Sequence, residues 1–80
     1  MNEWISVKDR LPTEEEYITT WNDGEETLSR ILIAFMTDTI EYEIGCYDGY
    51  KWMNEWCNKR ISDVVAWKKF VPYIPESSKE

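Results

Sequence analysis

The most strongly apolar segment of the chain is an unbroken hydrophobic run from Ile31 to Met36. It has the length of a strand and lacks polar positions, which predicts a central strand covered on both faces. The next segment, residues 39–47, alternates instead and predicts a half-buried strand. One face of that strand would carry Ile40, Tyr42, Ile44 and Cys46, and the other Glu41, Glu43 and Tyr47. Asp38, between the two runs, predicts a tight antiparallel link.

Turn signals bound several further short strands. Asp48-Gly49 is the strongest hairpin signal in the chain and predicts a type I′ turn, in which both central residues have positive φ. The returning strand would cover residues 50–53. Residues 54–62 are polar and fit either a loop or a further short hairpin around Asn58-Lys59. Apolar and β-branched residues predict two more strands, at residues 4–7 and 64–67.

One short helix is expected after Pro12, because Thr13 to Glu16 has the S/T-x-x-E form of a capping box. Asn22-Asp23-Gly24 predicts a turn, but residues 17–28 as a whole fit a helix, a strand or a loop. Pro72 and Pro75 are expected to end regular structure, and residues 76–80 to form a solvated tail.

Together these elements predict a single small, mainly β domain over residues 1–75, with a small α+β fold as the alternative. We expect a compact antiparallel meander or an SH3-like barrel of about four to six short strands. A chain of 80 residues leaves no room for a second domain and has a marginal core. Its twelve aromatic side chains offset that deficit, since each buries a large apolar area.

Composition removes several classes of function. The chain has no His, so most metal sites and the usual general base near neutral pH are not expected. Its net charge of −7 argues against a surface that binds duplex DNA. No apolar run is long enough to cross a membrane. There is also no G-x-S-x-G elbow and no P-loop, so we expect a protein that is not an enzyme and that uses no cofactor and no metal.

The two cysteines, Cys46 and Cys57, are expected to be free thiols. A disulfide between them would help so small a core, but the first residues show neither the basic start nor the apolar stretch of a signal peptide. A cytosolic setting keeps thiols reduced. The two residues stand eleven positions apart with no His or Cys neighbour, which is not zinc-finger spacing.

Six acidic residues fall within thirteen positions, with no basic residue among them, and form a candidate partner-binding patch: Glu14, Glu15, Glu16, Asp23, Glu25 and Glu26. Such a run is most often a solvated loop. The alternative is a docking surface for a basic groove, such as the nucleic-acid channel of a host effector, with long-range attraction speeding association.

Aromatic and basic residues gather around the Asp48-Gly49 hairpin and form a second candidate site, for a partner or a ligand: Tyr47, Tyr50, Trp52, Trp56, Lys59 and Arg60. The rings could stack on a nucleobase or anchor a protein interface, with the basic groups binding phosphate. The alternative is cross-strand packing that stabilises the hairpin. Lys68 and Lys69 are the other local basic residues, and edge-strand protection explains them equally well.

Three segments resemble one known family. Residues 4–12 read W-I-S-V-K-D-R-L-P and resemble the W-I-S-V-x-D-R-L-P opening of a small domain family found mainly in bacteriophages and prophages. Residues 45–52, G-C-Y-D-G-Y-K-W, resemble its central G-x-Y-D-G-x-x-W hairpin, and residues 64–67, V-V-A-W, its closing V-x-x-W. The longer stretch at residues 17–28 departs from the family pattern, and residues 68–75 replace its M-P-L-P ending. We expect Trp4 and Trp67 to close the ends of the sheet, with Arg10 stacked on one ring or paired with Asp9 or Glu3.

The family is one of unknown function, so the resemblance implies a context: a phage accessory protein in the cytoplasm of an infected bacterium. Small proteins of that kind often block host defence by binding. We therefore expect a non-enzymatic protein that inhibits a bacterial host factor, such as an anti-phage defence component, by direct protein–protein contact. The alternative is a sponge that sequesters a small nucleotide immune signal in an aromatic pocket. A self-complementary aromatic face would favour a homodimer.

Overall fold

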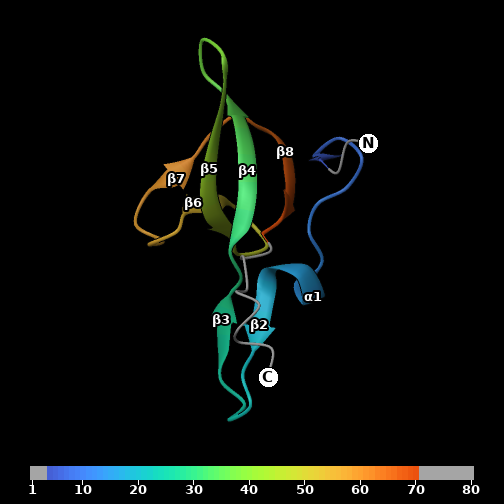
Figure 1. Cartoon of the computed structure of the whole chain (residues 1–80), viewed down its shortest axis with the longest axis vertical. Coiled ribbons are helices and arrows are strands. Elements are labelled where there is room, and N and C mark those ends of the chain that lie inside the picture. The colour runs from blue at the N-terminus through green and yellow to red at the C-terminus, as the bar shows by residue number, and fades with distance from the viewer. Residues whose placement is uncertain (1–3, 71–80) are drawn as a thin grey trace, which may run out of the picture.

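The structure is a computed structural model that describes residues 4–70. Its one helix is α1 (Glu14–Tyr17), and its strands are β1 (Ile5–Ser6), β2 (Ile18–Thr20), β3 (Glu26–Leu28), β4 (Ile31–Met36), β5 (Ile40–Tyr47), β6 (Trp52–Asn54), β7 (Arg60–Ile61) and β8 (Val64–Lys69). They form a six-stranded antiparallel sheet in the order β1-β8-β4-β5-β6-β7 and a separate β2–β3 hairpin (Figure 1). The fold is therefore mainly β, as the sequence predicts. Pro72, Pro75 and the tail at residues 76–80 lie outside the described residues.

The six-stranded sheet has to curl. Only Ser62 and Asp63 separate β7 from β8, yet β7 lies four positions from β8 in the sheet. Neighbouring strands are roughly 4.8 Å apart, so a flat sheet would place these two strands about 19 Å apart. The three peptide units from Ile61 to Val64 span at most about 11 Å. The link between them therefore bends the sheet toward a barrel.

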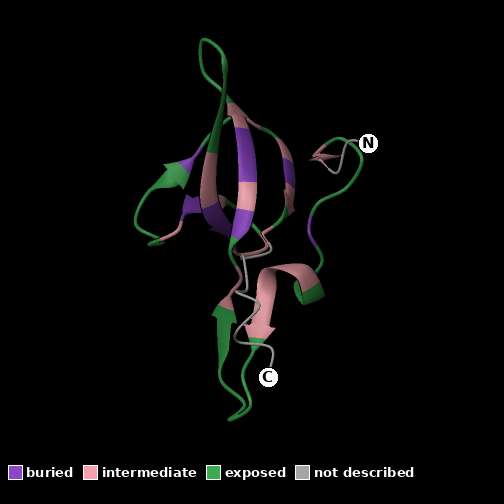
Figure 2. Ribbon diagram, in the orientation of Figure 1, coloured by how far each residue is buried: buried purple, intermediate pink, exposed green. Residues whose placement is uncertain are grey.

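The core lies on one face of this sheet. Ile33 pairs with Trp67 of β8 and with Glu43 of β5, and residues that pair across strands share a face. The buried cluster on this face consists of Ile31, Ile33, Tyr47, Ile61 and Trp67. Ile31, Ile33 and Trp67 are fully buried. The prediction that residues 31–36 form a central strand is confirmed, since β4 lies between β8 and β5 (Figure 2). The strand is not covered on both faces along its whole length, because Met36 is 44% exposed.

The sequence interpretation of β5 is correct for Cys46, which is buried, but wrong for Tyr47 and for the first residues of the strand. Tyr47 is in the core, whereas Ile40 and Tyr42 on the supposed apolar face are 38% and 64% exposed. The reason is the register of the neighbouring strand: β6 pairs with β5 only from Gly45 onward. The first half of β5 therefore has no strand on that side, and the β4–β5 hairpin projects from the body of the sheet (Figure 1).

The turn after Tyr47 is a hairpin turn as predicted, but it is not of type I′. Gly49 has a φ of 95°, whereas Asp48 does not have a positive φ. The Asp48 carboxylate accepts hydrogen bonds from the backbone N–H groups of Tyr50 and Lys51, each at 2.8 Å. These bonds hold a four-residue loop, Asp48 to Lys51, so the returning strand starts at Trp52 and not at residue 50.

Residues 17–28, which the sequence left open, form the end of α1 and the β2–β3 hairpin. The pairing runs from Ile18 with Leu28 to Thr20 with Glu26. The Asn22-Asp23-Gly24 turn closes this hairpin, with Gly24 at a φ of 88°. The short hairpin around Asn58-Lys59 is also present, as β6 and β7. In the β2–β3 hairpin, β-branched residues flank the turn signal, namely Ile18, Thr19, Thr20 and Thr27.

Candidate functional site

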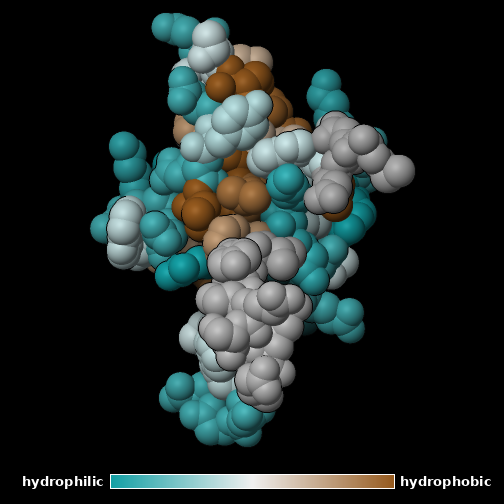
Figure 3. Space-filling view, viewed as in Figure 1, coloured by the Kyte–Doolittle hydropathy of each residue, from teal (hydrophilic) through white to brown (hydrophobic). Residues whose placement is uncertain are grey.

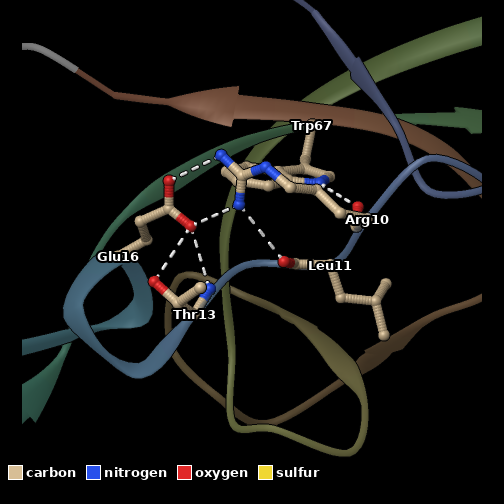
Figure 4. A network of polar contacts seen from close by, with 5 residues as sticks. All are labelled: Arg10, Leu11, Thr13, Glu16 and Trp67. Carbon is tan, nitrogen blue, oxygen red and sulfur yellow. Dashed lines mark hydrogen bonds and ion pairs between the residues drawn. The ribbon is translucent and has the colours of Figure 1, made fainter.

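Arg10 lies in the loop between β1 and α1 and links α1 to β8, since it contacts residues of both (Figure 4). Its guanidinium makes a bidentate ion pair with Glu16, with N–O distances of 2.8 and 2.9 Å. The same group lies over the ring of Trp67, 5.1 Å from the centroid. The Trp67 indole N–H in turn donates to the Arg10 carbonyl oxygen at 3.1 Å. The expected stacking on a Trp ring is thus confirmed, and the acid that pairs with Arg10 is Glu16.

Glu16 is consequently a structural residue. Its Oε1 also accepts hydrogen bonds from the Thr13 backbone N–H and hydroxyl, which closes the predicted capping box. The hydrogen bonds from Arg10, followed by the one from the Thr13 backbone, lower the pKa of Glu16 to about 2. Glu16 is therefore an anion already neutralised by its neighbour and is a poor candidate for binding a partner.

The other five acids of the predicted patch lie in two places. Glu14 and Glu15 are exposed on α1. Asp23, Glu25 and Glu26 lie at the far end of the β2–β3 hairpin, which points away from the six-stranded sheet (Figure 1). None of the five makes an ion pair with another described residue. The structure thus separates a patch that the sequence treated as continuous, because β2 lies between its two halves.

We call the far end of this hairpin the acidic hairpin tip: Trp21, Asp23, Glu25 and Glu26. All four residues are exposed, and Trp21 is 56% exposed. The tip is well ordered by local bonds: the Trp21 backbone N–H donates to the Glu25 carbonyl at 2.7 Å, and the Asp23 carboxylate accepts from the Glu25 N–H at 3.0 Å. The Trp21 indole N–H donates to the Thr27 hydroxyl. The tip therefore presents an aromatic ring beside uncompensated negative charge.

The predicted aromatic and basic cluster is not a single site. Tyr47 is buried and stacks on half-buried Trp52 at 4.5 Å between centroids, while Tyr17 meets Tyr47 edge-on at 5.4 Å. These rings form the core next to the Asp48 turn. Tyr50 and Trp56, by contrast, are 91% and 72% exposed, in two different loops. Packing thus explains two of the four aromatic residues of the cluster, and the two exposed rings remain available for binding.

Lys59 and Arg60 line a hollow of about 320 Å³. Phe35 and Asn54 also line it, together with the carboxylates Glu43 and Asp63. None of its four charged side chains makes an ion pair with a described residue. The hollow is therefore polar, carries charges of both signs and has one aromatic wall. A larger hollow of about 600 Å³ lies along the β2–β3 hairpin and includes Trp21, Leu28 and Phe70.

The structure also has an exposed apolar face, made of residues that the sequence pattern predicted to be buried. Cross-strand pairing places Met36, Ile40 and Tyr42 on the face opposite the core. Trp4 packs against Tyr42 at 5.6 Å between centroids, and the Lys68 ammonium lies 5.2 Å from the Trp4 ring. Figure 3 shows hydrophobic residues gathered over the β4–β5 hairpin. The alternation of residues 40–44 was the signal for this face, but its exposure depends on where β6 begins.

The described residues include two free thiols. Cys46 is buried and Cys57 is exposed, and neither is in a disulfide. Within residues 4–70, no group of three or more Cys, Asp or Glu side chains is placed to hold a metal ion. No helix in this part of the chain is long and apolar enough to cross a membrane.

Comparison of the chain with protein-family models, curated proteins and solved structures finds no significant match.

Proposed function

We propose that this chain is a phage-encoded, non-enzymatic binding protein that inhibits a bacterial host factor by direct protein–protein contact in the cytoplasm of the infected cell. The observation that carries the mode of binding is the acidic hairpin tip, with exposed Trp21 beside three acids that have no ion-pair partner among the described residues. The phage context rests on the resemblance of residues 4–12 to the phage domain family.

The tip has the two properties that a small inhibitor needs. Its exposed Trp can supply a large contact area at low entropic cost, and Trp is enriched among the residues that dominate binding energy. Its carboxylates attract a basic partner surface over a distance of about 10 Å at moderate salt. A basic nucleic-acid-binding effector, such as an anti-phage defence component, presents a surface of that charge. Glu14 and Glu15 on α1 add to the same negative field.

A matched pair of charge reversals tests this proposal. Glu25→Lys/Glu26→Lys reverses the tip, and Asp38→Lys/Glu41→Lys reverses two exposed acids on the β4–β5 hairpin with the same change in net charge. We expect one host protein to be captured from lysate by the wild type and by the control variant, but not by the tip variant. The purified host protein should then lose its activity when the wild type is added at low salt, and lose less at high salt.

Equal capture by the two variants would reject the tip as the contact, and binding without loss of the host protein's activity would reject inhibition. The oligomeric state of each variant, measured by light scattering, shows whether a second copy competes for the same surface. Phage plaquing on hosts that carry different defence systems, with and without the protein, then identifies the system concerned.

The second candidate, a sponge for a small nucleotide signal, is favoured by the 320 Å³ hollow that Lys59 and Arg60 share with Phe35. A phosphate on the basic pair and a base on the ring would suit such a ligand, although Glu43 and Asp63 oppose a highly charged one. A thermal-shift panel of cyclic and ADP-ribose-type nucleotides tests it. A ligand at a hundredfold excess over Kd should add about 2.7 kcal/mol of stability, and no shift would reject the sponge.

A further inference from the structure

The sulfur atoms of Cys46 and Cys57 lie 3.1 Å apart. Cys46 is the seventh residue of β5 and is 3% exposed, whereas Cys57 lies in the loop between β6 and β7 and is exposed. A disulfide requires the two sulfurs to be about 2.05 Å apart, so an approach of about 1 Å would join them. Two thiols this close, one of them reachable from solvent, form a pair that can be oxidised.

The position of Cys57 follows from the way Asn54 organises the loop. Asn54 is buried, and its side-chain oxygen accepts the Asn58 N–H at 3.0 Å while its amide donates to the Asn58 side chain at 2.6 Å. Its carbonyl oxygen accepts the Cys57 backbone N–H at 3.0 Å and the Cys46 thiol at 3.5 Å. One residue thus contacts both cysteines and fixes where the loop turns back over β5.

We propose that Cys46 and Cys57 form a reversible dithiol–disulfide pair, closed by exchange with a low-molecular-weight disulfide such as oxidised glutathione. Because the two sulfur atoms already lie close together, the bond can form with little rearrangement. Cys57 is exposed, so it is the thiol that the external disulfide can reach. This assignment does not depend on the identity of any binding partner. It makes the two free thiols expected from the sequence a modification site that links β5 to the loop between β6 and β7.

The exchange takes two steps. In the first, the Cys57 thiolate attacks one sulfur of oxidised glutathione, forms a mixed disulfide and expels one glutathione thiolate. In the second, the Cys46 thiolate attacks the Cys57 sulfur, forms the Cys46–Cys57 bond and expels the second glutathione thiolate. The two protons released by the cysteines are taken up by the two departing thiolates. The protein has then lost two electrons, which oxidised glutathione has gained.

The second step should be the slow one. Burial raises the pKa of Cys46 above its ordinary value, so its thiolate is scarce at neutral pH. The mixed disulfide on Cys57 should therefore accumulate before the internal bond closes. Closure would tie the loop of residues 55–59 to β5 and restrain exposed Trp56 and Lys59, which are two of the candidate binding residues.

The test uses the whole chain in glutathione buffers of increasing oxidised fraction, quenched with an alkylating reagent and analysed by intact mass. We expect the monomer to lose the mass of two hydrogens and both alkylation sites, and dithiothreitol to restore both. The closed form should unfold about 10 °C higher than the reduced form, since a short cross-link constrains the unfolded chain. Early time points should show one bound glutathione.

Two single variants separate the roles of the thiols. Cys46→Ala should stop at the mixed disulfide, with one glutathione on Cys57 that remains over time. Cys57→Ser, which changes only an exposed side chain and so preserves folding, should show neither loss of hydrogens nor bound glutathione. A wild-type chain that keeps two alkylatable thiols in oxidising buffer, or that forms only cross-linked dimers, would overturn the proposal.

Discussion

The guanidinium of Arg10 lies 5.1 Å from the centroid of the Trp67 ring, and the Trp67 indole N–H donates to the carbonyl oxygen of the same arginine. These two residues are 57 positions apart in the sequence. Trp67 is fully buried in the core, so this contact anchors the loop between β1 and α1 to β8. Packing against Trp67 therefore gives Arg10 a structural role.

The ion pair between Arg10 and Glu16 predicts a pH-dependent contribution to stability. The pKa of Glu16 is lowered to about 2, so the folded state favours its ionised form. This contribution is complete above the pKa of Glu16 in the unfolded chain, about 4.5, and is lost as the pH falls toward about 2. At neutral pH, Glu16→Gln should lower the free energy of unfolding by roughly 1 kcal/mol, a value reduced by partial solvent screening.

The measurement is thermal unfolding of the wild type and Glu16→Gln between neutral pH and the acid limit, followed by circular dichroism. The difference in Tm should shrink as the pH falls through this window. Glu15→Gln is the matched control, because Glu15 is exposed and makes no ion pair with a described residue. A difference for Glu16→Gln that stays constant with pH would contradict the assignment.

Two separate features of the turn favour glycine at position 49. Its φ of 95° is strained for any other residue, and an added Cβ would lie 2.9 Å from the Tyr17 hydroxyl. Gly24 has a similar φ of 88°, but a Cβ there meets nothing within 4 Å. We expect Gly24→Ala to cost about 1 kcal/mol and Gly49→Ala roughly 1 kcal/mol more.

Urea denaturation of these variants, repeated in a Tyr17→Phe background, measures the coupling. Removal of the hydroxyl should reduce the cost of Gly49→Ala toward that of Gly24→Ala and leave the cost of Gly24→Ala unchanged. Equal costs of Gly49→Ala in both backgrounds would show that Tyr17 does not approach this turn.

The aromatic residues around the Asp48 turn should separate by their effect on stability. Trp52 is half-buried and stacks on Tyr47, so Trp52→Ala should cost about 3 kcal/mol. Tyr50 and Trp56 are exposed, and their replacement by Ala should change stability by less than about 0.5 kcal/mol. Chemical denaturation measures all three. A large loss of stability for Trp56→Ala would mean that this ring packs in the core and is unavailable to a partner.

Local sequence patterns determined much of this fold in advance. The apolar run at residues 31–36, the capping box at Thr13 and the turn at Gly49 each depend on neighbouring residues, and each appears in the structure as an element or a turn. The exposure of Ile40 and Tyr42 could not be predicted in this way. It depends on the point at which β6 begins to pair with β5, which is a relation between distant parts of the chain.

The candidate sites show the same limit. Six acids close together in sequence suggested one patch, but Arg10 pairs with Glu16, and β2 separates α1 from the acidic hairpin tip. The spacing of Cys46 and Cys57 likewise gave no sign that their sulfurs meet, because the loop held by Asn54 brings them together. Charges and residue types can be read directly from the sequence. Which side chains lie close together depends on how distant strands and loops pair.

Asn54 should control closure of the Cys46–Cys57 bond without taking part in the chemistry. Asn54→Ala removes the side-chain bonds that hold Asn58 and keeps the carbonyl bond to the Cys57 N–H, so Cys57 should be held less firmly above Cys46. We expect a loss of roughly 2 kcal/mol of stability and slower conversion of the mixed disulfide to the internal bond, with an unchanged first step. Intact-mass time courses in glutathione buffer measure both steps. Lys59→Ala, an exposed change in the same loop, is the control, and equal second-step rates for the two variants would contradict this role for Asn54.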